Sequence, residues 1–127
     1  MNDRSVLVVD DSLITVRKLS QLIEDLGYRV VGTALNGEEA VERYRELSPD
    51  LVTMDITLPD ISGIEVVKRI LQLSPEALII MITSHGQEQM VIESIDAGAK
   101  GYVMKPVKPE ILRETLNNVF VKYGRIP

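Results

Sequence analysis

The chain has 127 residues, which suits one compact domain, and we expect residues 1–127 to form a single domain. It contains no cysteine and one histidine, which excludes disulfide bonds and metal sites built from thiolates or several imidazoles. The formal net charge of −5 argues against direct nucleic-acid binding, because binding to phosphates requires a basic surface. No apolar run is long enough to span a membrane and the start lacks a signal-peptide pattern, so we expect a cytoplasmic protein without a membrane segment.

Short apolar runs alternate with amphipathic segments along the whole chain. In chain order we expect a strand at 5–10, a helix at 13–26, a strand at 28–33, a helix to about 47, a strand at 51–54, a helix to about 73, a strand at 77–83, a helix at 87–97, a strand at 101–104 and a helix from 109 to about 122. Gly27 and Gly98 are helix stops. Asn36 and Ser62 predict N-caps, each with a glutamate three residues later, and Pro109 suits a first helical turn.

Five strands that alternate with five helices indicate an α/β fold with a parallel sheet covered on both faces. Because the expected strands lack alternating polar residues, both of their faces should be buried. Right-handed crossovers leave few topologies, and we expect a doubly wound, flavodoxin-like sheet of order 2-1-3-4-5. In this fold ligands bind at the carboxyl ends of the strands, between the first and third strands.

Polar residues follow four of the expected strands at that edge. Asp10 and Asp11 end the first strand, and Asp55 ends the third. Thr83 ends the fourth strand, and Lys105 follows the fifth. Because the carboxyl ends of parallel strands meet at one edge, we expect these side chains to converge there.

The chemistry of this set favours phosphoryl transfer with a divalent cation. Two like charges about 5 Å apart repel by roughly 3 kcal/mol at an effective dielectric of 20, so three carboxylates require a proton or a cation among them. Oxygen ligands without His or Cys suit Mg²⁺, Mn²⁺ or Ca²⁺. Asp55 could accept a phosphoryl group as an aspartyl phosphate, while Lys105 and Thr83 stabilise the charge of that group.

Taken one at a time, the same residues have simpler roles. Asp11 or Ser12 could cap the helix that follows the first strand. Thr83 could be an ordinary residue at a strand end, and Lys105 could be a solvated loop residue or only pair with Asp10. The joint pattern, and not any single residue, favours the functional interpretation.

The joint pattern resembles the receiver domain of bacterial response regulators. The residues that carry the resemblance are Val-Val-Asp10-Asp11-Ser12, Met54-Asp55-Ile56-Thr57-Leu58-Pro59 with Gly63, Thr83-Ser84 and Lys105-Pro106. The resemblance extends from about residue 5 to about residue 122, so we expect a single receiver domain. It implies that Asp55 is modified by a phosphoryl group taken from the phosphohistidine of a sensor kinase.

The resemblance also implies a Mg²⁺ ion and a set of ligands. Asp11 and Asp55 would bind the ion directly, Asp10 through a water molecule, and Thr57 through its carbonyl oxygen. No other cofactor is expected.

Two further roles follow from the resemblance. Thr83 and Lys105 would contact the phosphoryl group, with a cis peptide bond between Lys105 and Pro106. Thr83 and Tyr102, which occupies the aromatic position of the family three residues before Lys105, would form a switch that reports phosphorylation to a distant surface.

The implied function is two-component signalling and not an enzyme activity. Because no output domain accompanies the expected receiver, the chain resembles the stand-alone chemotaxis regulators of the CheY type. Its implied partners are a sensor histidine kinase and a downstream protein, with the flagellar motor switch and a phosphatase as candidates.

Three other interpretations remain open. An FMN carrier would share the fold, but Asp10 and Asp11 stand where its phosphate-binding loop should be. A Mg²⁺-dependent phosphatase of the haloacid dehalogenase type would space its two aspartates as D-x-D, whereas here they are adjacent. The chain could also be a receiver excised from a longer regulator.

Overall fold

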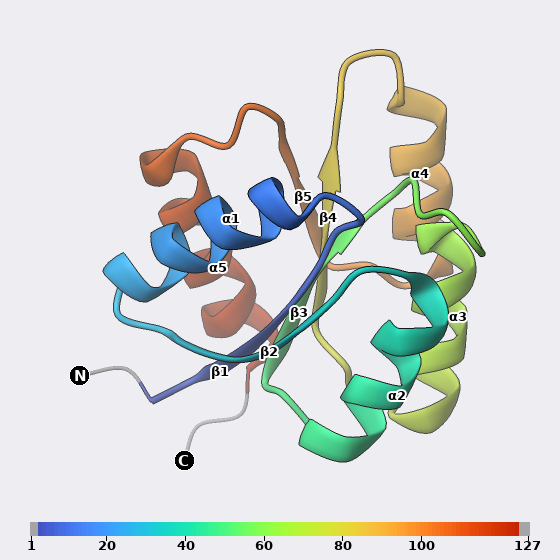
Figure 1. Cartoon of the computed structure of the whole chain (residues 1–127), viewed down its shortest axis with the longest axis horizontal. Coiled ribbons are helices and arrows are strands. Elements are labelled where there is room, and N and C mark those ends of the chain that lie inside the picture. Colours follow the sequence, from blue (N-terminus) through green and yellow to red (C-terminus); the bar gives the residue numbers. More distant parts are fainter. Residues whose placement is uncertain (1–2, 125–127) are drawn as a thin grey trace.

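The computed structural model describes residues 3–124, and its elements follow the expected order of alternating strands and helices (Figure 1). The strands are β1 Ser5–Val9, β2 Arg29–Ala34, β3 Leu51–Asp55, β4 Ile79–Thr83 and β5 Gly101–Met104. The helices are α1 Leu13–Asp25, α2 Gly37–Leu47, α3 Gly63–Leu73, α4 Glu88–Ala97 and α5 Pro109–Tyr123.

The five strands form one parallel sheet of order β2-β1-β3-β4-β5, which confirms the expected doubly wound topology. Every residue of β1, β3 and β4 is buried, because these strands have neighbours on both sides and helices on both faces. The edge strands β2 and β5 are partly exposed. Their polar and glycine residues are tolerated because only part of each strand is covered.

Two apolar layers hold the helices against the sheet, one on each face. Figure 1 shows α1 and α5 on one side of the sheet and α2, α3 and α4 on the other. Alternate residues of β1 supply the two layers: Val6 and Val8 face α1 and α5, whereas Leu7 and Val9 face the other three helices. The core residues that α1 and α5 contribute are Val16, Leu19, Ile23, Leu112, Leu116, Val119 and Phe120.

The expected N-caps are present, although their glutamate partners are used differently. The side-chain oxygens of Asn36 and Ser62 accept hydrogen bonds from the third residue beyond each, at 2.8 and 3.2 Å. Glu39, however, accepts from the backbone N–H of Leu35, and Glu65 bonds Arg69 instead of reaching back to the cap. Each helix therefore has the first half of a capping box but not its reciprocal bond.

The sheet brings the carboxyl ends of β1, β3, β4 and β5 to one edge of the molecule (Figure 1). Among residues 3–124, no helix is both long and apolar enough to cross a lipid bilayer. The start of α3 lies close to the end of β3, where the N–H of Gly63 donates to the Ile56 carbonyl at 2.8 Å. A side chain at position 63 would collide with the Asp55 carbonyl, so this glycine allows the helix to approach the strand end.

Candidate functional site

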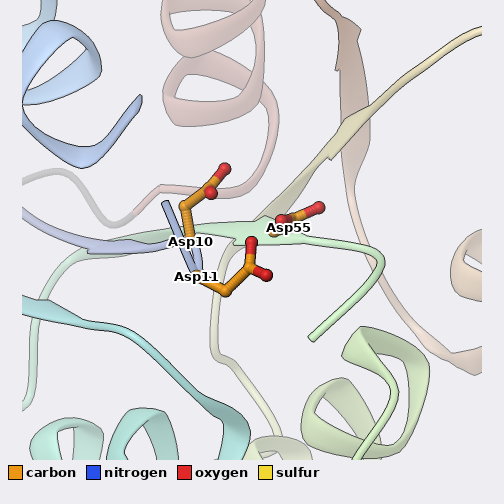
Figure 2. Close-up of side chains that lie close together, drawn as sticks. All are labelled: Asp10, Asp11 and Asp55. Atoms are coloured by element: carbon orange, nitrogen blue, oxygen red, sulfur yellow. The ribbon is translucent and has the colours of Figure 1, made fainter. Parts of the chain in front are cut away.

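Three carboxylates gather at the carboxyl edge of the sheet (Figure 2). One oxygen of Asp10, one of Asp11 and one of Asp55 all lie within 4.8 Å of one another. Asp10 and Asp55 are buried, whereas Asp11 is exposed to solvent. The structure thus joins the two aspartates after β1 with the one that ends β3, as the sequence predicted.

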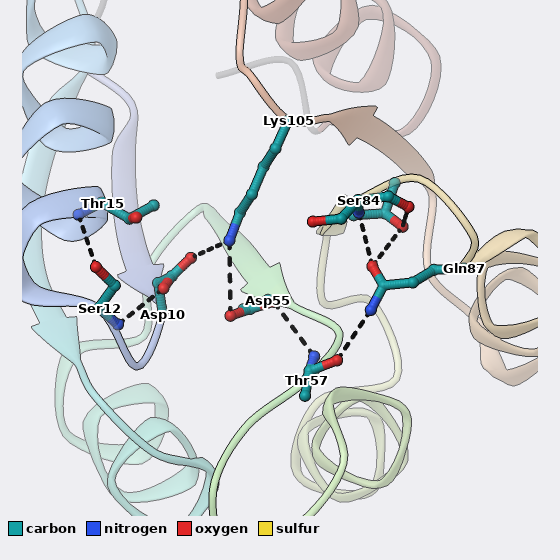
Figure 3. A network of polar contacts seen from close by, with 9 residues as sticks. Asp10, Ser12, Thr15, Asp55, Thr57, Ser84, Gln87 and Lys105 are labelled. Carbon is teal, nitrogen blue, oxygen red and sulfur yellow. Dashed lines mark hydrogen bonds and ion pairs between the residues drawn. The ribbon is translucent and has the colours of Figure 1, made fainter.

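The ammonium group of Lys105 lies against this cluster from the loop after β5 (Figure 3). Its Nζ is 2.9 Å from Asp10 Oδ2 and 3.8 Å from Asp55 Oδ2. The Lys105–Pro106 peptide bond is cis, as expected, and the Lys105 N–H donates to the Thr83 carbonyl at 2.7 Å. Lys105 therefore pairs closely with Asp10 and still reaches the carboxylate of Asp55.

The environment of Asp55 makes its charged form unfavourable. Burial raises the pKa of Asp55 to about 6 from an ordinary value of 3.8, and the negative charges of Asp10 and Asp11 add to the rise. The positive charge of Lys105 and a hydrogen bond from the Thr57 N–H at 3.2 Å act in the opposite direction. Because Lys105 lies nearer to Asp10, it compensates the charge on Asp55 only in part.

Local backbone geometry explains why Asp11 is available to the cluster. The Ser12 hydroxyl caps α1 by accepting from the Thr15 N–H at 3.3 Å, so the simpler role considered for Asp11 belongs to Ser12. Asp10 Oδ1 in turn accepts from the Ser12 N–H at 2.9 Å. That bond turns the chain at the end of β1 and leaves the Asp11 carboxylate directed at the shared space.

Thr83 is buried at the end of β4, and its hydroxyl is engaged by a residue that the sequence did not single out. It donates to Gln87 Oε1 at 3.0 Å, and the Ser84 carbonyl lies at 3.3 Å. The same carboxamide bonds the Ser84 N–H and the Thr57 hydroxyl. A side-chain bridge between two loops leaves no periodic signal in a sequence, so nothing in the sequence pattern pointed to Gln87.

Tyr102 does not lie in the acidic cluster. Its side chain on β5 is 51% exposed and lines a groove of about 410 Å³ that Thr83 also lines. Apolar side chains of α4, among them Ile92 and Ile95, form much of the rest of this groove. The groove thus joins the two residues expected to form a switch, although they belong to different strands.

The donor set suits a hard divalent cation. Within residues 3–124, these three aspartates are the only close group of acidic, histidine or cysteine side chains able to hold a metal ion. Their donors are all carboxylate oxygens, the ligands that Mg²⁺ and Ca²⁺ prefer. The carboxyl raised to a pKa of about 6 would release its proton more readily beside such an ion.

Comparisons with known proteins agree with this geometry. The family model described as the response regulator receiver domain matches residues 6–117. Over 116 residues the chain is 48% identical to the chemotaxis protein CheY of Thermotoga maritima, and the match covers 91% of this chain and 97% of that protein.

Solved structures give the same answer. A two-component response regulator of the LuxR family from Aurantimonas sp. SI85-9A1 superposes with a TM-score of 0.89 at 35% identity, over 95% of this chain and 87% of that one. A chain from the CheX–CheY–BeF3–Mg²⁺ complex of Borrelia burgdorferi gives a TM-score of 0.87 at 37% identity, over 92% and 89%. The family match, the sheet order and the three gathered aspartates together show that this chain belongs to the response regulator receiver domain family and is a two-component signalling protein.

Proposed function

We propose that the Asp55 carboxylate accepts a phosphoryl group from the phosphohistidine of a sensor histidine kinase. The observation that carries this proposal is the convergence at one rim of Asp10, Asp11 and Asp55, with the Lys105 ammonium 3.8 Å from Asp55 Oδ2. The pKa of Asp55 is raised, and its contact to Lys105 is longer than that of Asp10. The charged form of Asp55 is therefore stabilised when positive charge or a phosphoryl transition state arrives beside it.

We propose Mg²⁺ as the cofactor of this reaction. Asp11 and Asp55 would hold the ion directly, Asp10 through water and Thr57 through its carbonyl oxygen. When bound, the ion would neutralise charge on the transferring phosphoryl oxygens. The all-oxygen donor set and the mutual repulsion of the three carboxylates support this assignment.

The transfer itself needs a nucleophile and charge stabilisation from the chain. An oxygen of ionised Asp55 attacks phosphorus while the P–N bond of the phosphohistidine breaks, and the electron pair of that bond stays on the imidazole. Lys105 pairs with a phosphoryl oxygen in place of its longer contact to Asp55. The Thr83 hydroxyl donates a hydrogen bond to another phosphoryl oxygen.

Phosphorylation would be read out at the groove between α4 and β5. If the Thr83 hydroxyl turns toward the phosphoryl group, its place beside the groove becomes available to the Tyr102 ring, which is half exposed in this structure. A partner that binds the inward position of Tyr102 would prefer the phosphorylated chain, by linkage. The groove that Thr83 and Tyr102 share supports this coupling.

The proposed partners follow from the receiver family and its relatives. A sensor kinase would supply the phosphoryl group, and a downstream protein would bind the α4–β5 surface. The 48% sequence identity to a chemotaxis protein favours a role in a chemotaxis pathway, with the flagellar motor switch as a candidate target. The Borrelia structure holds a CheX–CheY complex, so a CheX-type protein is a second candidate partner. We also propose a phosphatase as a partner that removes the phosphoryl group.

We propose that the chain is a signalling protein that does not turn over substrates. We also propose that residues 1–127 form one receiver domain and that the protein works in the cytoplasm. A receiver of this kind would undergo a single modification per cycle. Turnover of p-nitrophenyl phosphate would instead favour a phosphatase, and a yellow colour on purification would favour an FMN carrier.

Intact mass spectrometry after treatment with acetyl phosphate tests the proposal. With Mg²⁺ we expect one phosphoryl adduct on the wild type and none on Asp55→Asn. Asp60→Asn is the matched control, because it removes the same charge from the loop that follows β3, outside the cluster, and it should keep the adduct. An adduct of equal yield on Asp55→Asn, or equal yield in EDTA, would overturn the assignment.

A further inference from the structure

Gln87 stands between the end of β4 and the loop after β3, and its carboxamide bonds both (Figure 3). Its Oε1 is 2.6 Å from the Ser84 nitrogen and 3.0 Å from the Thr83 hydroxyl oxygen. Its Nε2 is 2.9 Å from the hydroxyl oxygen of Thr57. One half-buried side chain thus links the residue that ends β4 to the residue two positions after Asp55.

The partners fix the orientation of this carboxamide. A backbone N–H can only donate, so the group facing Ser84 must be the oxygen. The amide nitrogen therefore faces Thr57, whose hydroxyl accepts. Although Gln87 occupies the N-cap position of α4, its side chain makes no capping bond to that helix. All hydrogen bonds of its carboxamide go instead to residues at the carboxyl edge of the sheet.

The Thr83 hydroxyl has one proton and therefore one strong bond to donate. In this structure that proton goes to Gln87 Oε1, the nearer of its two acceptors. A phosphoryl oxygen on Asp55 would need the same proton. The two acceptors therefore compete for one donor, and the bond to Gln87 must break before Thr83 can move.

We propose that Gln87 is a positioning residue that holds Thr83 away from Asp55 until the phosphoryl group arrives. This inference rests on the proposed function, because it requires a phosphoryl group at Asp55. Gln87 acts on that group through Thr83 and needs no contact with it. The bond to Thr57 anchors the carboxamide, so the end of β4 stays tied to the loop after β3 in the unphosphorylated chain.

A second consequence concerns α4. Because Gln87 precedes the first residue of that helix, release of Thr83 removes one of the bonds that tie the start of α4 to the rim. The groove beside α4 is lined by Thr83, Ser84 and Glu88, which lie on either side of Gln87 in the chain. Gln87 thus joins the acidic cluster to the surface expected to bind a partner.

The size of the effect follows from a neutral hydrogen bond. Loss of one such bond changes an equilibrium by about 2- to 10-fold. Gln87→Met keeps the length of the side chain and removes its donor and acceptor. With beryllofluoride and Mg²⁺ as the phosphoryl mimic, Gln87→Met should lower the dissociation constant of the mimic by about that factor.

The experiment measures that dissociation constant from amide NMR signals during titration. Gln89→Met is the matched control, because Gln89 is an exposed glutamine in the first turn of α4, and it should leave the dissociation constant unchanged. The pair is then repeated in a Thr83→Val background. Because Gln87 acts through the Thr83 hydroxyl, the gain from Gln87→Met should be smaller there.

Each possible result either supports or overturns the proposed role of Gln87. A gain that shrinks in the Thr83→Val background supports the proposal, since a merely structural role of Gln87 would not depend on that hydroxyl. The proposal is overturned if Gln87→Met leaves the dissociation constant of the mimic unchanged or raises it. It is also overturned if Gln87→Met lowers this constant equally in the wild-type and Thr83→Val backgrounds. If the wild type forms an Asp55 adduct by mass spectrometry, these failures concern Gln87 alone, whereas absence of the adduct refutes the proposed function and the inference with it.

Discussion

Neutralising Asp55 should stabilise the metal-free protein. In the folded state the pKa of Asp55 is raised to about 6 from 3.8, so the native state holds a proton that the unfolded chain has already released between these values. Stability therefore falls as pH rises through that window and stays low above pH 6. Asp55→Asn resembles the protonated carboxyl, so it should avoid this loss.

The magnitude follows from the pKa. A rise from 3.8 to about 6, at roughly 1.4 kcal/mol per pKa unit, corresponds to an upper bound of about 3 kcal/mol. Solvent at the rim screens the charge of Asp55, which lowers the expected gain to about 1–3 kcal/mol at pH 7. Near pH 4 the gain should approach zero, because the wild-type carboxyl is then protonated in the folded state.

Urea unfolding in EDTA from pH 4.5 to pH 8 measures this difference directly. The advantage of Asp55→Asn should grow with pH and level off above pH 6. Glu114→Gln, which removes one charge from an exposed position on α5, should show no such growth. Two results would refute the conclusion that the charge of Asp55 destabilises the metal-free protein. One is an Asp55→Asn variant that is less stable than wild type in EDTA, and the other is a stability difference that does not depend on pH.

Three further predictions concern the metal and two other sites. Millimolar Mg²⁺ should raise the melting temperature of the wild type more than that of Asp55→Asn, and equal increases would argue against binding at the cluster. Thr53→Val should raise the free energy of unfolding by about 1 kcal/mol, because the buried Thr53 hydroxyl has no hydrogen-bond partner among residues 3–124. Urea unfolding checks this, and a lower free energy of unfolding would show that the hydroxyl is satisfied. The Asp60 carboxylate accepts from the N–H groups of Gly37 and Glu38 at the start of α2, and these bonds lower its pKa to about 2. Asp60→Ala should therefore lower the melting temperature at pH 7, by an amount that shrinks as pH falls from 4 toward 2, and a constant difference would contradict this role.

The fold was predictable because each strand is a short apolar run with a clear boundary. The central strands β1, β3 and β4 are buried throughout, so their sequences carry no competing polar pattern. The ends of the strands were predicted less accurately. The strand expected at 77–83 begins at Ile79, because the Ala77 N–H already donates to the Ser74 carbonyl in a turn. Local hydrogen bonds of this kind decide boundaries and leave no mark on hydrophobic periodicity.

The acidic cluster was predictable for a different reason. Parallel strands place their carboxyl ends at one edge, so Asp10 and Asp55 had to meet once the sheet order was known. The side-chain bridges were not predictable, since Gln87 reaches Thr57 across 30 positions and Asp60 reaches Gly37 across 23. Such contacts depend on how two loops lie relative to each other, which neither residue type nor spacing reveals.

The placement of the acidic cluster and of Thr83 at strand ends has a consequence for how such a protein can diversify. Asp10, Asp55 and Thr83 are held by buried backbone, whereas the outward faces of α4 and α5 contribute no group to the acidic cluster. Substitutions on those helices can therefore change which protein is recognised while the proposed acceptor site stays unchanged. Gln87 is the exception, because a change there alters a surface helix and the rim together. An engineer who re-targets the α4 surface should keep this glutamine fixed.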